Sequence, residues 1–420
     1  MSGLVTSDPT LKPDNIQFAT IPNIIPPELL EESDYAGFNQ LVMTKMEPLF
    51  EELLDRLKPP VNAIIGDVEL GWPTDVGIRR NIPVALSWTM SSSFFSMSYN
   101  LARFRQNKLS LLDFSGAGDE FAVDIPGIPS AHLGRLRTVF DENDHKFLHL
   151  YMDAILKVQK AQYLIFSSVH ELEPECFNSL KAIFPFPVYT IGPSIPYLQL
   201  KHTKFTSTAD HNNHDNHLQW LDSQPVGSVL YISFGSFLSI SDTQMVEIAA
   251  ALKITGIRYF WVAREKENWL KENFGDHNEK GLIVPWCEQL KVLSHSSIGG
   301  FWSHCGWNST LEALFAGVPI LTFPLFLDQF PNSKQIVEDW KNGWEVKRTD
   351  ELGNKMLVTK EEIAELVKRF MDFESTEGNE MRNRAKNLKD FCHSAIAKGG
   401  SSDSNLNAFM GSISSRENEY

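Results

Sequence analysis

Residues 286–329 read WCEQLKVLSHSSIGGFWSHCGWNSTLEALFAGVPILTFPLFLDQ, and this segment is the most informative part of the chain. Two apolar runs, 298–301 and 320–323, are candidate strands, and a segment with the character of a helix starts between them near Asn308. A helix start offers unpaired backbone N–H groups and the positive end of the helix dipole, so an anion such as a diphosphate fits there. The stretch therefore predicts a strand, an anion site, a helix and a second strand in that order.

The same alternation of strands and helices extends in both directions along the chain. Further candidate strands are residues 61–65, 84–87, 163–167, 229–234, 259–262 and 283–284, and helical segments separate most of them, from 38–57 near the start to 363–391 near the end. One helix has the spacing of a capping box, with Ser241 followed by Gln244 three residues later. Repeated units of this kind predict an α/β protein with doubly wound parallel sheets, which bind ligands outside the carboxyl ends of their strands.

Composition divides the chain into four parts. The region 193–222 combines Pro193 and Pro196 with a polar tract at 206–217, which is typical of a linker. We therefore expect a first domain at 1–200, a linker at 201–217, a second domain at 218–400, and a C-terminal helical segment at 401–420 after the break at Gly399 and Gly400.

Charge and composition exclude several classes of protein. The chain has 38 Lys and Arg against 53 Asp and Glu, so its formal charge of −15 disfavours a broad electrostatic grip on nucleic acid or on an anionic membrane. Its 4 cysteines form no CxxC pair, which indicates reduced thiols in the cytoplasm. The start of the sequence does not resemble a secretory signal, and no apolar run approaches the roughly 20 residues of a membrane helix. We expect a cytoplasmic monomer without a membrane span.

Polar groups gather around the predicted anion site. A base could stack on Trp286 at a strand end, a ribose diol could bind Glu312, and sugar hydroxyls could bind Asp328 and Gln329 after the next strand. The groups beside the helix start are His304, Gly306, Asn308 and Ser309. Two alternatives need no ligand: Ser309 and Glu312 also have the spacing of a capping box, and Trp286 also suits an apolar core.

Two groups of possible metal ligands in the sequence are disfavoured as metal sites. Adjacent His304 and Cys305 lack a second ligand pair at zinc-finger spacing. His211, His214 and His217 could bind a metal, but their polar surroundings favour a solvated loop.

The segment 286–329 resembles the signature segment of the plant family 1 UDP-dependent glycosyltransferases, because Trp, Gln, HCGWNS, Glu and DQ occur in order at the family's spacing. The resemblance extends over almost the whole chain, and RRNIP at 79–83 is similar to the group numbered 87. Other matching phrases are PGIP at 126–129, HELEPE from His170, IGP at 191–193, VLYISFGS at 229–236 and KGGSS from Lys398. It implies a GT-B fold, in which two Rossmann-like domains face each other across a cleft.

The resemblance also implies a role for each residue of the predicted site. Trp286 would stack on uracil, with Gln289 near the base and the backbone beside Cys287 pairing with its edge. Glu312 would accept both ribose hydroxyls, and the diphosphate would lie against His304, Gly306, Asn308, Ser309 and Ser236. Asp328 and Gln329 would bind the sugar, glucose being expected from Gln329, and Trp307 would contact it through an apolar face and a backbone N–H. The donor substrate would be UDP-glucose, with no metal and no cofactor.

The first half raises a question about the general base. The resemblance implies that Asp67 orients a His that follows the first strand, but this His has no counterpart in the chain. Because residues 13–28 match family sequence that follows the second strand, the initial strand–helix–strand unit is expected to be missing, as in a truncated chain, leaving an unstable first domain and little or no activity. Asp67 also has an alternative as a helix N-cap.

We therefore predict an inverting UDP-glucosyltransferase that acts on a hydroxyl of a small lipophilic acceptor. Trp88, Met90, Phe94 and Phe95 are candidates for an apolar acceptor pocket. The alternative is a non-catalytic UDP-sugar-binding or interaction protein, since the expected base is missing. A nicotinamide-dependent oxidoreductase is disfavoured, because the sequence has no GxGxxG turn after a strand.

Overall fold

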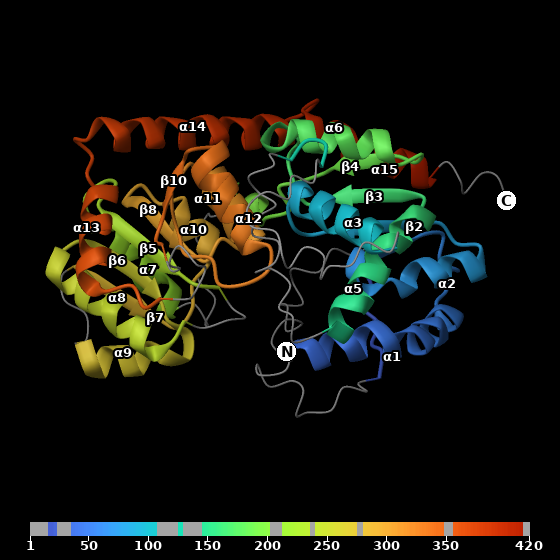
Figure 1. The fold of residues 1–420 in the computed structure, drawn as a ribbon, viewed down its shortest axis with the longest axis horizontal. Coiled ribbons are helices and arrows are strands. Elements are labelled where there is room, and N and C mark those ends of the chain that lie inside the picture. Colours follow the sequence, from blue (N-terminus) through green and yellow to red (C-terminus); the bar gives the residue numbers. More distant parts are fainter. Residues whose placement is uncertain are drawn as a thin grey trace.

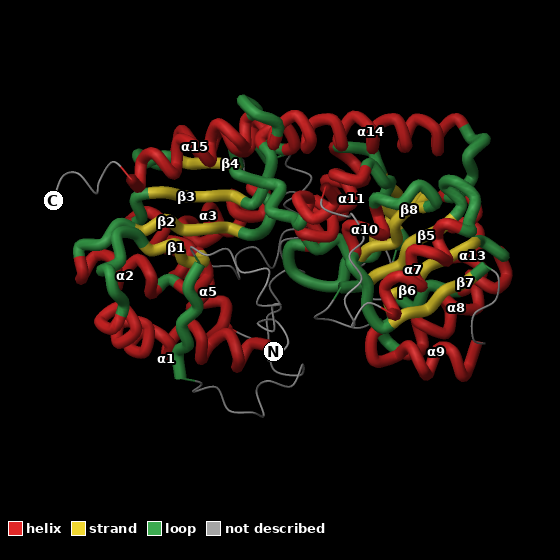
Figure 2. The backbone as a smooth tube through the Cα atoms, turned by 180° about the vertical axis from the view of Figure 1, so that it is seen from behind, coloured by secondary structure: helices red, strands yellow, loops and turns green. Residues whose placement is uncertain are grey.

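The computed structural model describes residues 16–22, 35–106, 125–128, 145–201, 212–235, 240–274, 280–347 and 356–414. These residues form two parallel β-sheets, each with helices against it, that lie side by side along the longest axis of the molecule (Figure 1). The tube in Figure 2 shows the same two α/β units from behind, with a long helix running across the top of both. The predicted α/β class is confirmed.

The first sheet has the strand order β1-β2-β3-β4, and all of its strands run parallel. The strands are β1 (Ile64–Asp67), β2 (Val84–Trp88), β3 (Tyr163–Phe166) and β4 (Val188–Thr190), and the helices of this part are α1 (Tyr35–Arg56), α2 (Trp72–Arg80), α3 (Ser92–Gln106), α5 (His145–Lys157) and α6 (Pro174–Ile183). β1 is an edge strand of this sheet as described, and Ile65 on it is 61% exposed. Short helical turns lie at η3 (Val68–Leu70), η6 (Val158–Lys160), η7 (His170–Leu172) and η8 (Tyr197–Lys201).

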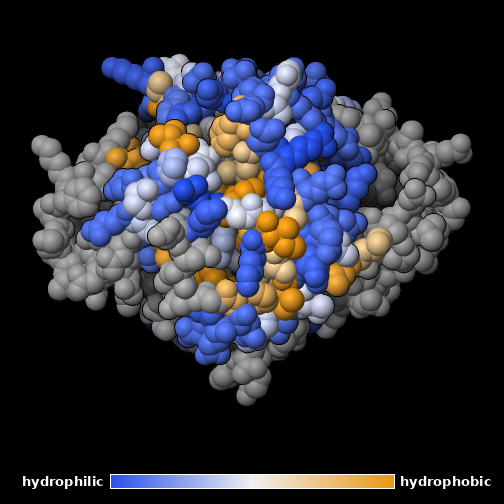
Figure 3. All heavy atoms as spheres, turned by 90° about the vertical axis from the view of Figure 1, so that its left-hand side faces the viewer, coloured by the Kyte–Doolittle hydropathy of each residue, from blue (hydrophilic) through white to orange (hydrophobic). Residues whose placement is uncertain are grey.

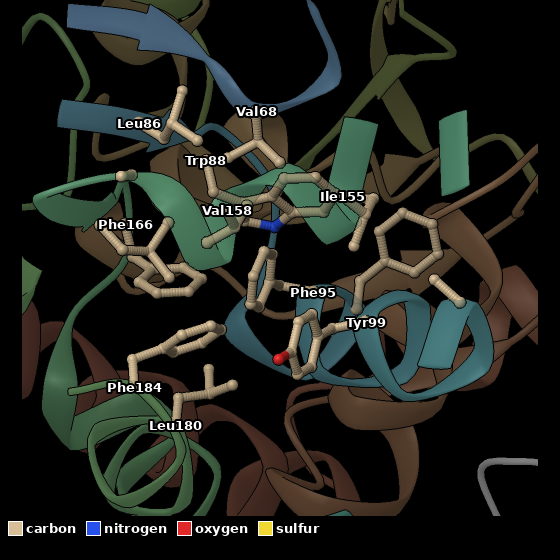
Figure 4. Close-up of a cluster of buried hydrophobic side chains, with 14 of the residues drawn as sticks. Val68, Leu86, Trp88, Phe95, Tyr99, Ile155, Val158, Phe166, Leu180 and Phe184 are labelled. Atoms are coloured by element: carbon tan, nitrogen blue, oxygen red, sulfur yellow. The ribbon is translucent and has the colours of Figure 1, made fainter. Parts of the chain in front are cut away.

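The core of the first domain is rich in aromatic rings (Figure 4). Trp88, Phe94 and Phe95 are all 0% exposed, and the Phe95 ring meets those of Trp88 and Phe166 edge to face at 5.3 and 5.2 Å between centroids. The expectation that these three residues line an acceptor pocket is wrong, because their rings are enclosed by other core side chains. Met90 is partly buried and packs against the same core.

The second sheet has the order β10-β9-β8-β5-β6-β7 and is also parallel throughout. Its strands are β5 (Val229–Ser233), β6 (Arg258–Val262), β7 (Gly281–Val284), β8 (Ile298–Ser303), β9 (Ile320–Thr322) and β10 (Gly343–Glu345). Its α-helices are α7 (Asn212–Asp222), α8 (Asp242–Thr255), α9 (Glu267–Phe274), α10 (Gln289–Leu293), α11 (Trp307–Ala316), α12 (Gln329–Lys334) and α13 (Lys360–Phe370). A short helical turn lies at η9 (Arg264–Lys266), and a π-helix lies at η10 (Gln335–Asp339). The three-residue strands β4 and β10 have no counterpart among the predicted strands.

Only half of the predicted capping box before α8 forms. The Ser241 hydroxyl accepts from the Gln244 backbone N–H at 3.2 Å, as predicted. The Gln244 side chain instead pairs with the backbone of Val358, at 2.9 and 3.0 Å. A tertiary contact has therefore replaced the local one, and it ties α8 to the segment that precedes α13.

The last predicted helical stretch is divided, and its end returns to the first domain. α14 (Thr376–Ile396) runs across both units in Figures 1 and 2, and α15 (Ser401–Ser414) lies beside β4. Phe409 packs with Tyr163 at 5.6 Å between ring centroids, and the Asn405 side-chain amide donates to the Thr190 carbonyl at 2.9 Å. The C-terminal segment thus covers a strand that is more than 200 residues away in the sequence.

Part of the region expected to be a linker is helical. α7 includes His214 and His217, and the His217 ring meets Phe260 edge to face at 5.8 Å between centroids. The solvated-loop interpretation is therefore wrong for His217, whereas His211 lies outside the described residues. The described part of the chain contains no group of three His, Cys, Asp or Glu side chains arranged to hold a metal ion.

Candidate functional site

The start of α11 is the centre of the candidate site. β8 ends at Ser303, and α11 begins at Trp307 with Gly306 as an N-cap that has no side chain to satisfy the first turn. Ser309 is the third residue of the helix, so it cannot be the N-cap of a box with Glu312, and the capping-box alternative is wrong. Asn308 is exposed on the first turn. A helix start without a side-chain cap suits an anionic ligand.

The ring of His304 is held between two glycines. A Cβ atom built on Gly235 would lie 2.6 Å from His304 Nε2, and one on Gly306 would lie 2.5 Å from the same atom. Burial lowers the pKa of His304 to about 4, against a smaller opposing effect of a hydrogen bond with the Ser233 backbone. At neutral pH the ring is therefore uncharged.

Gln289 joins three elements of the site. Its side-chain amide group donates to the Ser309 hydroxyl at 3.0 Å and to the Glu312 carboxylate at 2.5 Å, and its oxygen accepts from the Tyr231 hydroxyl at 3.1 Å. Burial raises the pKa of Glu312, and the bond from Gln289 partly offsets this effect. The start of α10 and the first turns of α11 are thus held together by side chains that were expected to contact one nucleotide.

Two further residues of the predicted site lie close by. Trp286 is 53% exposed, which excludes the core alternative. Cys287 is buried, and its sulfur lies 3.4 Å from the Tyr231 hydroxyl. Ser236, the remaining expected diphosphate ligand, lies outside the described residues.

Asp328 and Gln329 follow β9, where α12 begins. Burial raises the pKa of Asp328 to about 7, partly offset by hydrogen bonds from Asn332 at 2.8 Å and from the Trp307 backbone. Asn332 also donates to the Cys305 carbonyl at 3.0 Å, so it links this helix to the loop before α11. Asn332 was not predicted as a site residue from the sequence. Its position four residues after Asp328 nevertheless places both side chains on one face of a helix. Gln329 accepts from two backbone N–H groups of its own loop through Oε1, at 2.8 and 3.1 Å.

The end of β1 brings carboxyl groups of the first domain toward Asp328. Asp67 is the N-cap of η3 and accepts from the Glu69 backbone N–H at 2.8 Å, so it takes the position that its alternative predicted. Burial raises the pKa of Glu69 to about 8, with further contributions from the nearby charges of Asp67 and Asp328. Burial also raises the pKa of Asp67. Glu69 was missed, and its only signal was a second acid two residues after Asp67.

Trp307 lies differently from the expectation. Its indole is 3% exposed and donates to the Ser167 carbonyl of the first domain at 3.1 Å. The indole is therefore enclosed by protein, and the backbone N–H of Trp307 donates to the Asp328 carboxyl group.

The described helices include none that is long and apolar enough to cross a membrane. The face of the second domain in Figure 3 is mostly hydrophilic, with apolar residues in between.

Comparisons with known proteins identify similar chains over almost the whole sequence. The family described as "UDP-glucoronosyl and UDP-glucosyl transferase" matches residues 191–384. UDP-glycosyltransferase 87A1 of Arabidopsis thaliana is 45% identical over 98% of this chain and 91% of that protein, and UDP-glycosyltransferase 87A2 of the same plant is 42% identical over 97% and 87%. The structure of Phytolacca americana UGT2 complexed with UDP-2-fluoro-glucose and pterostilbene has a TM-score of 0.76 and 27% identity, covering 96% of this chain and 88% of that one.

The expected resemblance, group and two-domain GT-B fold are thereby confirmed. The chain belongs to the plant UDP-glycosyltransferases, with its relatives in group 87.

Proposed function

We propose that this glycosyltransferase transfers glucose from UDP-glucose to a hydroxyl of a small lipophilic acceptor, with inversion at the anomeric carbon. The Gln289 side-chain amide donates to both Ser309 and Glu312 beside a helix start, that of α11, which has no side-chain cap, and this arrangement is the main support for the proposal. A base stacked on the exposed face of Trp286 would place its ribose toward Glu312 and its diphosphate toward the helix start. Matching solved structures include one with UDP-2-fluoro-glucose bound.

The contacts of Glu312, Gln289 and His304 support one mode of donor binding. Glu312 would accept the ribose hydroxyls, and its partner Gln289 would keep the carboxylate oriented. His304 is neutral at physiological pH, so it would donate a hydrogen bond to the diphosphate while the backbone N–H groups and dipole of α11 stabilise the negative charge.

Sugar recognition would depend on which end of the Gln329 side-chain amide faces the sugar. Its Oε1 atom is engaged by two backbone N–H groups, so Nε2 is the end that would donate to a glucose hydroxyl. Asp328 lies beside it, and its carboxyl group would accept from another hydroxyl.

The transfer would be one displacement. The acceptor oxygen bonds to the anomeric carbon, the bond from that carbon to the diphosphate oxygen breaks, and its electron pair leaves with UDP. The His that Asp67 at the end of β1 would orient has no counterpart in the chain, so the proton of the acceptor hydroxyl would pass to solvent water. Transfer would then lack the roughly 10²- to 10⁴-fold contribution of general-base catalysis. No metal and no cofactor takes part in this proposal, and we propose a cytoplasmic monomer of plant secondary metabolism.

The test is UDP binding by calorimetry together with a transfer assay on the purified chain, using UDP-glucose and phenolic acceptors. Binding with release of glucoside supports the proposal, and polarimetry or NMR of the product then tests inversion. Binding without turnover would favour the non-catalytic UDP-sugar-binding alternative. Absence of UDP binding would refute the proposed site.

A further inference from the structure

Two tryptophan side chains of the second domain hold one segment of the first. The Trp307 indole N–H donates to the Ser167 carbonyl, and the Trp340 indole N–H donates to the Leu172 carbonyl, each at 3.1 Å. The two rings pack against each other, with centroids 6.3 Å apart. Both acceptors belong to the segment 167–172, which follows β3, and we refer to the two side chains as the indole pair.

The contact lies in an apolar cluster that both domains build. Val169 and Leu172 come from the first domain, while Trp307 and Leu311 come from α11, and all four are at most 4% exposed. A hydrogen bond is electrostatically stronger in such surroundings than in water, and an unpaired carbonyl there is costly. Each indole bond therefore favours one placement of the segment 167–172 relative to the second domain.

On the side of the first domain, the segment is connected to α3. The Ser167 N–H donates to the Trp88 carbonyl at 2.9 Å, and the Ser168 hydroxyl donates to Glu173 at 2.9 Å. Glu173, which is 5% exposed, accepts in turn from the backbone N–H groups of Ser92 and Ser93 at the start of α3. Hydrogen bonds thus link the segment to the carboxyl ends of β2 and β3, the edge of a parallel sheet where ligands bind.

On the side of the second domain, Trp307 opens α11. It directly precedes Asn308 and Ser309, which are the proposed diphosphate ligands. Trp340 follows η10 instead and has no proposed donor ligand next to it in the chain. Of the indole pair, only Trp307 therefore connects the first domain directly to the helix turn that would hold the leaving group.

We propose that Trp307 is a positioning residue for transfer, whose indole holds the start of α11 at a set distance from the ligand-binding edge of the first sheet. The inference rests on the proposed function and deepens it, because it assigns a role in bringing donor and acceptor together. Displacements of about 1 Å between reacting groups can lower the rate about 100-fold, so the hydrogen bond from the Trp307 indole to the Ser167 carbonyl would affect the rate of transfer.

The test compares Trp307→Phe with Trp340→Phe. Each change keeps an aromatic ring and removes one indole donor to the segment 167–172. UDP-glucose is supplied with pterostilbene or another phenol used by the native chain, and glucoside and free glucose are measured together. In Trp307→Phe we expect the ratio of transfer to hydrolysis to fall by about 10- to 100-fold, because water needs no held geometry while the acceptor does. Trp340→Phe should change the ratio by less than about threefold.

This ratio does not depend on the amount of folded protein, so partial unfolding of a variant cannot produce the expected result. An unchanged ratio in Trp307→Phe, or equal losses in both variants, would overturn the inference.

Hydrogen exchange gives a second readout that needs no turnover. UDP should slow exchange of the amides at 168–172 in the native chain, and this effect should be lost in Trp307→Phe at saturating UDP. Equal protection in both proteins, or none in the native chain, would refute the role of Trp307. Failure of the native chain to bind UDP would instead refute the proposed function.

Discussion

Replacing Glu312 by Gln tests the proposed nucleotide site most directly. The change keeps the shape of the side chain but converts one carboxylate oxygen into an amide donor. Gln289 already donates to Glu312 Oε2 at 2.5 Å, so the remaining acceptor capacity of the carboxylate decides how well it accepts two ribose hydroxyls. We expect Glu312→Gln to lose at least one of these bonds.

The expected size follows from the charge of the lost acceptor. A hydrogen bond to a charged group contributes about 1.5–3 kcal/mol, which corresponds to a dissociation constant for UDP about 10- to 150-fold higher. The free energy of unfolding of the ligand-free protein should rise or stay unchanged in Glu312→Gln. Burial raises the pKa of Glu312, so its charge is a cost to the folded state that glutamine does not carry.

The assay is calorimetry with UDP and with UDP that lacks one ribose hydroxyl. The native chain should bind the deoxy ligand about 10-fold or more weakly, whereas Glu312→Gln should discriminate between the two by less than about threefold. Glu361→Gln is a matched control, because that side chain is 70% exposed on α13. A Glu312→Gln variant that binds UDP as the native chain does, with full discrimination against the deoxy ligand, would remove Glu312 from the ribose site.

Three further predictions follow from the burial of charged and backbone groups. The folded-state pKa of Glu69 is raised from 4.5 to about 8, so its favourable contribution to stability is fully present below about pH 4.5 and lost as the pH rises to about 8. The melting temperature should therefore fall between about pH 4.5 and about pH 8, and a fall of equal size in Glu69→Gln would contradict this. Gly235→Ala should weaken UDP binding about tenfold or more by calorimetry, because its Cβ would meet His304 Nε2 at 2.6 Å on a backbone with φ of +84°, whereas Gly411→Ala, with nothing within 4 Å, should not. Glu173→Gln should lower the free energy of unfolding of the first domain by about 2 kcal/mol or more in urea titrations, because donors would face donors at the start of α3; an unchanged midpoint would show that these bonds contribute little.

The features that the sequence predicted well are local ones. The two strands within the segment 286–329 and the start of α11 between them depend on apolar periodicity and on neighbours along one chain segment. The family resemblance rests on the same contiguous residues, and it extends to the two-domain fold because relatives of group 87 match over nearly the whole chain.

The features that the sequence did not predict involve residues far apart in the chain. Apolar aromatic residues near a predicted ligand edge suit a pocket and a core equally well, and packing against α5 and α6 placed Phe94 and Phe95 in the core. The Gln244 side chain had a local partner available, but Val358 occupied it instead.

Patterns in the sequence were sufficient to predict the two α/β units and the start of α11, because hydrophobic period and residue spacing act over a few turns of chain. Three contacts are evident only in the folded chain: the Trp307 indole lies between the domains, Glu69 lies near the charge of Asp328, and α15 packs on the first sheet. Those contacts arise from the summed burial of surfaces separated by up to several hundred residues, which no local pattern records.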